Sequence, residues 1–138
     1  PGAGFTDGTP WLPVNPNHRA INADAEEADP NSVLNYYRRL IALRHEDETV
    51  QLGDFTMLLP DHPHVYAFTR SRGDDALLVL GNFSGDPQPV VFDPAWDAAA
   101  VVIGNYASPS PLHGGAVTLQ PWEAIVLRRN AGPTGARR

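Results

Sequence analysis

The stretch DPNSVLNYYRRLIALR, residues 29–44, decides the expected fold. Asp29 belongs to a residue type that caps helices, and Pro30 suits a first helical position, where a missing N–H has no helical partner to lose. At about 100° per residue, the apolar side chains that follow fill one half of a helix. They are Val33, Leu34, Tyr36, Tyr37, Leu40, Ile41 and Leu43. The sequence therefore predicts a helix over residues 29–44 whose apolar arc is wide enough to contact two partners.

Arg44 lies by angle within this apolar arc. A buried guanidinium without a partner would be very costly. We therefore expect Arg44 either to pair with a carboxylate or to extend past the C-terminal end of the helix, where a cation is favoured.

Composition excludes several classes of protein. The chain has 138 residues, is 42% hydrophobic and carries a net charge of −6. Nucleic acid binding needs a cationic surface, so no nucleic acid partner is expected. There is no cysteine, which rules out disulfides and thiolate metal sites. No apolar run approaches the roughly 20 residues that span a membrane, and no cofactor motif is present.

Residues 1–28 are dense in proline and glycine, which disfavours helix interiors and central strands. They also carry large apolar side chains, which a free linker rarely does. These are Phe5, Trp11, Leu12, Val14 and Ile21. We predict an ordered loop that leads into the helix. The chain opens without a methionine, and we expect it to be a fragment or a processed product.

After the polar residues 45–49, the hydrophobic period changes from 3.6 to 2, which is typical of strands. The predicted strands are 50–59, 65–70, 76–83, 88–92, 100–105, 116–119 and 122–128. Leu77–Leu80 is continuously apolar and is expected in the central strand. Short strands with turn residues between them predict an antiparallel β-sandwich over residues 50–130, followed by a flexible tail at 131–138.

Several segments together resemble glycoside hydrolase family 13, in its α-glucosidase and oligo-1,6-glucosidase branch. GFTDGTPWLPVNPN at 4–17 and INADAEEADPNSVLNYYRRLIALRHE at 21–46 are similar to the family's stretch from the eighth barrel strand through the eighth barrel helix. GDFTMLLPDHPHVYAFTR at 53–70, DDALLVLGNFSG at 74–85 and QPWEAIVLRR at 120–129 resemble the β-sandwich that follows the barrel. The resemblance implies a mainly β chain: residues 1–49 would be the tail of an otherwise missing (β/α)8 barrel.

The same resemblance implies a function for the parent protein. Family members are retaining enzymes with an aspartate nucleophile, a glutamic acid/base and a second aspartate, all in motifs that would precede Pro1. The expected partner of this chain is therefore the upstream catalytic barrel of the same protein, and the chain alone is expected to be inactive, with no catalytic residue, metal or cofactor. A cytoplasmic location is expected. Open alternatives are a free-standing carbohydrate-binding or interaction module, and a trehalose synthase or sucrose-active relative.

By the resemblance, the loop that leaves the top of the barrel contains Asp7, Trp11, Asn15 and Asn17. Aromatic rings beside amides suit sugars, because C–H faces stack on rings and hydroxyls need donors and acceptors. These residues are candidates for lining the approach to the substrate. The structural alternatives are that Trp11 anchors the loop to the barrel rim and that Asp7 caps a turn.

Other polar residues have simpler explanations. Glu26, Glu27 and Asp29 precede the helix, where negative charge is favoured by its dipole. Asp74-Asp75 fits a solvated turn. His62 and His64 would share one face of a strand, but no third ligand is evident, so no metal site is predicted.

The sequence makes different predictions for two tryptophans. Trp122, followed by Ile125 and Leu127, is expected to pack in the sandwich or at its border with the barrel. Trp96 lies in the loop sequence DPAWDAA, which leaves open a surface platform for sugar.

Overall fold

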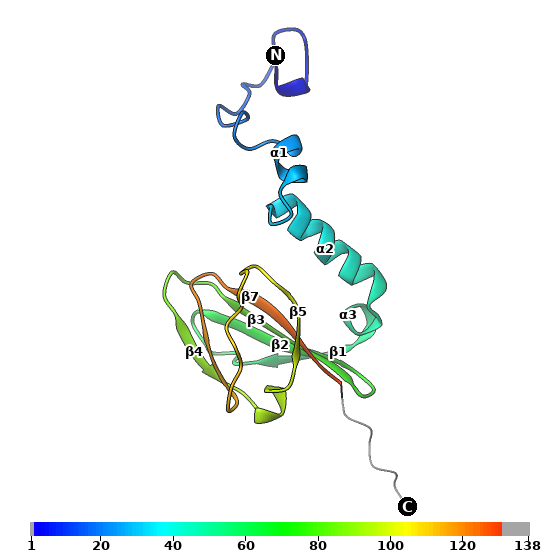
Figure 1. Ribbon diagram of the computed structural model, residues 1–138, viewed down its shortest axis with the longest axis vertical. Coiled ribbons are helices and arrows are strands. Elements are labelled where there is room, and N and C mark those ends of the chain that lie inside the picture. The colour runs from blue at the N-terminus through cyan, green and yellow to red at the C-terminus, as the bar shows by residue number, and fades with distance from the viewer. Residues whose placement is uncertain (1, 131–138) are drawn as a thin grey trace, which may run out of the picture. The chain divides into compact units, whose positions relative to one another are not determined.

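A computed structural model of the chain describes residues 2–130 (Figure 1). The chain forms two compact units, Pro1–Ala42 and Leu43–Arg138. The tail predicted at 131–138 lies outside the described residues. Among the residues that are described, no helix has the length and apolar character needed to cross a bilayer.

The first unit contains η1 (Gly2–Gly4), α1 (Ala23–Ala28) and the beginning of α2 (Val33–Glu46). The prediction of a loop throughout residues 1–28 is therefore wrong at α1. The Asn22 side chain accepts a hydrogen bond from the backbone N–H of Ala25 at 2.9 Å, and this N-cap starts the short helix.

Helix α2 begins later than the sequence predicts. Asp29 does not cap it; its carboxylate accepts from the N–H of Asn31 at 2.8 Å, within the turn that precedes the helix. The N-cap is Ser32, whose hydroxyl accepts from the N–H of Asn35 at 3.2 Å. Pro30 therefore belongs to the turn, and the first helical residue is Val33.

The predicted apolar arc of α2 is largely open to solvent. None of the helix's residues is buried, and Val33, Tyr37 and Ile41 each expose more than half of their area. Leu34, Tyr36 and Leu40 are half-buried.

The second unit begins with the end of α2 and a short helix, α3 (Glu48–Leu52). Asp47 caps α3 by accepting from the N–H of Val50 at 3.0 Å. The strand predicted over 50–59 is thus shorter, because β1 runs over Asp54–Leu58. An N-cap aspartate followed by Glu48 in the first turn explains why a helix forms here.

Within residues 2–130, seven strands form two antiparallel sheets, which confirms the predicted sandwich. The larger sheet has the order β1-β2-β3-β7-β5, with β2 at Val65–Arg72, β3 at Asp75–Asn82, β7 at Ala124–Asn130 and β5 at Ala100–Gly104. The smaller sheet pairs β4 (Gln88–Val91) with β6 (Ala116–Leu119). Leu77–Leu80 lies in β3, which is the central strand as predicted.

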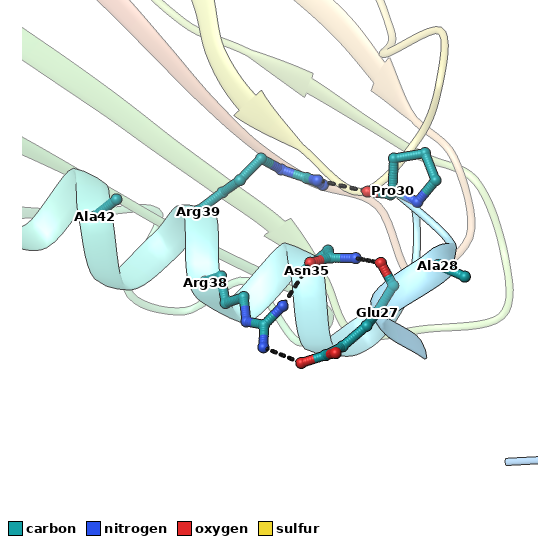
Figure 2. A pocket seen from close by; sticks show the side chains of 7 residues that line it. All are labelled: Glu27, Ala28, Pro30, Asn35, Arg38, Arg39 and Ala42. Atoms are coloured by element: carbon teal, nitrogen blue, oxygen red, sulfur yellow. Dashed lines mark hydrogen bonds and ion pairs between the residues drawn. The ribbon is translucent and has the colours of Figure 1, made fainter. Parts of the chain in front are cut away.

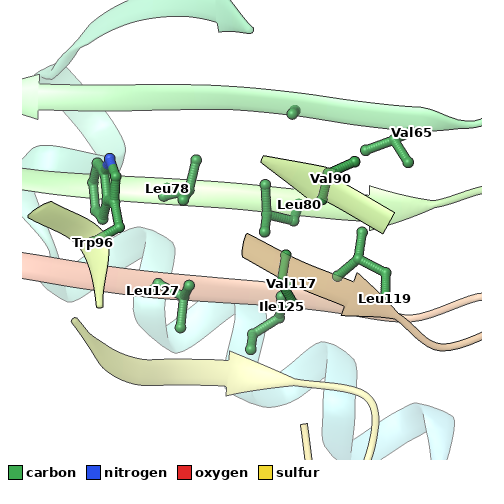
Figure 3. Close-up of a cluster of buried hydrophobic side chains, with 10 residues drawn as sticks. Val65, Leu78, Leu80, Val90, Trp96, Val117, Leu119, Ile125 and Leu127 are labelled. Carbon is green, nitrogen blue, oxygen red and sulfur yellow. The ribbon is translucent and has the colours of Figure 1, made fainter. Parts of the chain in front are cut away.

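The core lies between the two sheets (Figure 3). Leu78 and Leu80 of β3 are completely buried there, together with Leu119 of β6. Side chains alternate between the two faces of a strand. Residues that alternate with Leu78 and Leu80 along β3 therefore face the other side of the large sheet. Burial of each such leucine contributes roughly 1.5–3 kcal/mol.

The position of Trp96 rules out the surface platform, and that of Trp122 rules out one of its two predicted roles. Trp96, in the short helix η2 (Pro94–Trp96), is only 6% exposed and belongs to the core, so it cannot be a surface platform. Trp122 is 60% exposed in the turn before β7 and does not pack in the sandwich. A role for Trp122 at a border with the barrel stays a prediction.

Candidate functional site

The loop at the beginning of the first unit encloses a hollow of about 570 Å³. Phe5 and Trp11 line it and expose 89% and 92% of their areas. Of the four predicted loop residues, the structure brings Trp11 and Asn15 together in this lining, with His18 beside them. Asp7 and Asn17 are exposed and lie outside it.

Asn15 organises the turn at one end of this hollow. Its backbone carbonyl accepts from the N–H of His18 at 3.1 Å and contacts the His18 Nδ1 at 2.9 Å. Its side-chain oxygen accepts from the N–H of Asn17 at 3.2 Å. The lining thus offers exposed aromatic and aliphatic surface beside a fixed amide, which suits the apolar face of a sugar ring. No carboxylate lines this hollow, so within the described part of the chain it has no acid or nucleophile for glycoside hydrolysis.

The junction of α1 and α2 is fixed by polar contacts around a shallower hollow of about 480 Å³ (Figure 2). Arg38 forms an ion pair with Glu27 at 2.7 Å and donates to the Asn35 side chain at 3.3 Å. Arg39 donates to the carbonyl of Pro30 at 2.7 Å. These contacts hold the two helices together, and they use the polar groups that a ligand would need.

Glu26 stabilises the start of α2, as its position in the sequence predicts. Its carboxylate accepts from the N–H of Leu34 at 3.2 Å, and its carbonyl accepts from Ser32 Oγ at 2.6 Å. The Asn35 side chain donates to the same carbonyl at 2.9 Å. The acidic residues before α2 are therefore structural.

In the second unit, a polar cluster attaches α3 to the large sheet. Thr49, which is buried, donates to the Asp75 carboxylate at 2.6 Å. Arg128 of β7 pairs with Asp47 and, through Nε at 3.4 Å, with Asp75. The sequence predicted that Asp75 is a solvated turn residue, and this prediction is wrong. Asp75 is the first residue of β3 and is partly buried in this cluster.

The Asp47 carboxyl has a perturbed pKa. Burial alone would raise the pKa, but hydrogen bonds from the backbone of Val50 and the guanidinium of Arg128 outweigh it and hold the pKa below the ordinary value of 3.8. A carboxyl whose pKa is lower in the folded state stabilises the fold above its unfolded pKa, and that contribution disappears as the pH falls through the folded pKa.

We therefore expect the free energy of unfolding to fall as the pH drops below about 4, and the Asp47→Asn variant to show a smaller fall. The asparagine keeps an acceptor for the N–H of Val50 but has no charge to lose. Urea unfolding at several pH values measures the difference. Identical pH dependence in the two proteins would contradict the role of the Asp47–Arg128 pair.

The structure also shows the surroundings of Arg44 and His62, two residues that the sequence analysis singled out. Arg44 is exposed, and no carboxylate among residues 2–130 pairs with it, so this chain does not bury its guanidinium. The His62 Nδ1 accepts from the N–H groups of His64 at 3.2 Å and Val65 at 2.9 Å, which closes the turn before β2. Over the described residues, no group of three potential ligands is arranged to hold a metal ion.

Glu123 has a structural role that no sequence pattern predicts. Its side chain is 1% exposed, and its carboxylate accepts from Ser110 N, Ser110 Oγ and Gln120 N, each at 2.7 Å. Ser110 is distant in the sequence, so only the isolated charge between Trp122 and the apolar strand residues could have drawn attention to it.

Comparison with family models divides the chain into two parts. Residues 1–53 match the model described as alpha amylase, catalytic domain. Residues 65–126 match the model of the C-terminal domain of the alpha-amylase SusG.

The chain is similar to bacterial glycosidases and to related sucrose-converting enzymes. It is 40% identical over 129 residues to oligo-1,6-glucosidase from Parageobacillus thermoglucosidasius, covering 91% of the chain and 23% of that relative. The crystal structure of Bacillus licheniformis trehalose-6-phosphate hydrolase superposes with a TM-score of 0.84 at 35% identity, over 92% of this chain and 23% of that one. Isomaltulose synthase from Erwinia rhapontici superposes with a TM-score of 0.84 at 35% identity, over 94% and 23%. The chain thus spans about a quarter of the length of these relatives.

Proposed function

The chain belongs to the α-amylase family of glycoside hydrolases, family 13, in the α-glucosidase and oligo-1,6-glucosidase branch, and from this membership we propose that it forms the C-terminal part of a retaining α-glucosidase. In this proposal the longer protein hydrolyses α-glucosidic bonds in disaccharides or short oligosaccharides. The single observation that carries it is the succession of matches, to a catalytic domain over residues 1–53 and to a C-terminal domain over residues 65–126.

This chain would complete the catalytic domain without supplying its reacting groups. Retaining hydrolysis needs two carboxyl groups about 5–5.5 Å apart on either side of the scissile bond. In barrel enzymes, such groups come from the ends of several strands. Three buried or partly buried carboxylates of the described chain have structural partners instead: Asp47 and Asp75 bind Arg128, and Glu123 binds three hydrogen-bond donors. We therefore expect the upstream barrel to be the partner of this chain.

The hollow beside Trp11 and Asn15 is the part of this chain that we expect near the substrate. Its exposed rings would meet the sugar after the barrel is complete, whereas Asp7 and Asn17 would act only if the barrel turned them toward it. Similarity to trehalose-6-phosphate hydrolase and isomaltulose synthase supports a second candidate, a disaccharide-specific or sucrose-active enzyme of the same branch. A free-standing sugar-binding module is less well supported, because it would have no use for residues that match a catalytic domain. A cytoplasmic location stays a prediction.

Hydrolysis of p-nitrophenyl α-glucoside tests the proposal. We expect turnover by the longer protein that contains this sequence and none by residues 1–138 alone. Hydrolysis by the 138-residue chain that a substitution within it abolishes would overturn the proposal. A chain that elutes as a monomer from gel filtration and binds maltose would favour the free-standing module.

A further inference from the structure

Helix α1 is held by hydrogen bonds and not by burial. It has six residues, none of them buried, and helices this short are not stable in water on their own. Two side-chain amides bind its ends: Asn22 precedes the helix, and Asn35 belongs to α2. The position of α1 therefore depends on these two asparagines.

The Asn35 amide holds the C-terminal end of α1. Its Nδ2 donates to three carbonyls, those of Glu26 at 2.9 Å, Glu27 at 3.3 Å and Asp29 at 2.8 Å. The last carbonyls of a helix have no partner within it, so this one side chain satisfies groups that would otherwise lack a donor. The Asn35 Oδ1 accepts from Arg38, which also pairs with Glu27 (Figure 2). Helix α2 thereby fixes the place where α1 ends.

The Asn22 amide connects the other end of α1 to the turn beside the hollow of Trp11. Its Oδ1 accepts from the N–H of Ala25 at 2.9 Å and caps the helix. Its Nδ2 donates to the carbonyls of His18 at 3.0 Å and Arg19 at 3.4 Å, which belong to the turn. The oxygen of this side chain thus serves the helix, and the nitrogen serves the turn.

From this turn, further hydrogen bonds reach the lining of the hollow. The N–H of His18 donates to the carbonyl of Asn15 at 3.1 Å, and the Asn15 side chain accepts from the N–H of Asn17 at 3.2 Å. Asn15 and His18 line the hollow together with Trp11. A continuous series of hydrogen bonds therefore connects α2, through α1, to the residues that we expect near the substrate.

We propose that Asn22 and Asn35 are positioning residues that hold the hollow in place for the sugar on the leaving-group side of the cleaved bond. This inference rests on the proposed function. The hollow has no carboxylate in its lining, so the reacting groups lie elsewhere. Its rings and the Asn15 amide suit a neutral sugar, and Trp11 is 92% exposed, so a departing sugar can leave from here. A hydrogen bond to that sugar weakens steeply when its geometry changes, which makes the position of the turn important.

Asn22→Asp in the longer protein tests this inference. Aspartate caps a helix as well as asparagine does, so α1 keeps its start. Its carboxylate cannot donate, so the link to the turn is lost. Asn35→Asp removes the donor at the other end of α1. Asn31→Asp is the matched control, since Asn31 is exposed and contacts Asp29 through its backbone N–H, which aspartate retains.

Two substrates separate positioning from general damage. α-Glucosyl fluoride and a disaccharide deliver the same glucosyl group, but only the disaccharide has a sugar on the leaving-group side. The disaccharide is the one of maltose, isomaltose, sucrose and trehalose that the unmodified protein hydrolyses fastest. We expect Asn22→Asp to lower kcat/KM for it by about three- to ten-fold, mainly through KM, which is the scale of one lost hydrogen bond. For α-glucosyl fluoride, kcat/KM should stay within about two-fold of the unmodified protein.

Asn35→Asp should show a larger loss with the same selectivity, because its carboxylate would face three carbonyls, and Asn31→Asp should show none. Equal losses on both substrates in Asn22→Asp would indicate general damage and overturn the inference. Unchanged kinetics on both would show that the turn keeps its place without the link, and would overturn it too. So would a loss in Asn31→Asp equal to that in Asn22→Asp, which would assign the effect to added charge. If Asn35→Asp fails to fold, Asn22→Asp decides, because it retains the cap.

The unmodified longer protein separates this inference from the proposed function. Absence of turnover of both p-nitrophenyl α-glucoside and α-glucosyl fluoride would overturn the proposed function and, with it, the positioning role. Turnover of these substrates together with an unselective Asn22→Asp variant would overturn the positioning role alone.

Discussion

Replacing Trp96 with alanine is expected to lower the free energy of unfolding of the sandwich by about 3–5 kcal/mol. The side chain is 6% exposed and lies in the core cluster with Leu78 and Leu127 (Figure 3). The Arg129 guanidinium lies over its ring, 4.6 Å from the centroid, and closes the site from the other side. Truncation would therefore leave a cavity that the surrounding strands cannot fill. Urea unfolding of the 138-residue chain, followed by far-UV circular dichroism, measures the loss.

Trp122→Ala is the matched control. Trp122 is 60% exposed, and its contacts with Ser84 and Asn105 are made by its backbone, which alanine retains. Its φ of 58° is equally unfavourable for alanine, so that cost does not change. We expect a change within about 0.5 kcal/mol. Equal losses in the two variants would show that the turn, and not the core, limits stability.

The two tryptophans show what sequence patterns can and cannot predict. Trp122 precedes an apolar strand, so local reasoning predicts burial, but a turn at positive φ directs it outward. Trp96 lies among loop residues, and its burial depends on strands from distant parts of the chain. Local sequence carries little information about such contacts.

Patterns that repeat over several residues gave the most reliable predictions. The alternation in residues 65–70 and the continuous apolar run at 77–80, separated by turn residues, correctly identified β2 and β3 and the central strand. Errors occurred where a single capping residue decides the outcome. Asn22 and Asp47 each start a helix of only five or six residues, and Ser32 moves the start of α2 beyond Pro30.

The candidate site was only partly predictable for a related reason. Trp11 and Asn15 are close in sequence, and the structure brings them together in one hollow. Asp75 and Glu123 acquire their roles from partners such as Thr49 and Ser110, which are distant from them in the sequence. Family resemblance supplied the larger context, because it rests on whole segments and not on single contacts.

Glu123→Ala is expected to destabilise the sandwich by about 3 kcal/mol or more. The carboxylate accepts three hydrogen bonds from Ser110 and Gln120 while almost completely buried, and no cation among the described side chains neutralises it. Removing the acceptor leaves two backbone N–H groups and one hydroxyl without partners in a site that water does not easily reach. Two milder variants grade the effect. Ser110→Ala removes one donor and should cost about 1 kcal/mol, and Glu123→Gln, which keeps one acceptor oxygen, should lie between them.

The location of the damage distinguishes this explanation from a general loss of packing. Glu123 joins the segment that contains Ser110 to the turn at Gln120, whereas the amides of β3 are held by the ladders to β2 and β7. In Glu123→Ala, hydrogen exchange should therefore accelerate first at the amides of Ser110 and Gln120, and the amide of Leu78 should exchange only with global unfolding. If all three amides accelerate equally, the carboxylate supports the whole sandwich. If none does and stability is unchanged, Ser110 and Gln120 have found other acceptors and the expected cost is wrong.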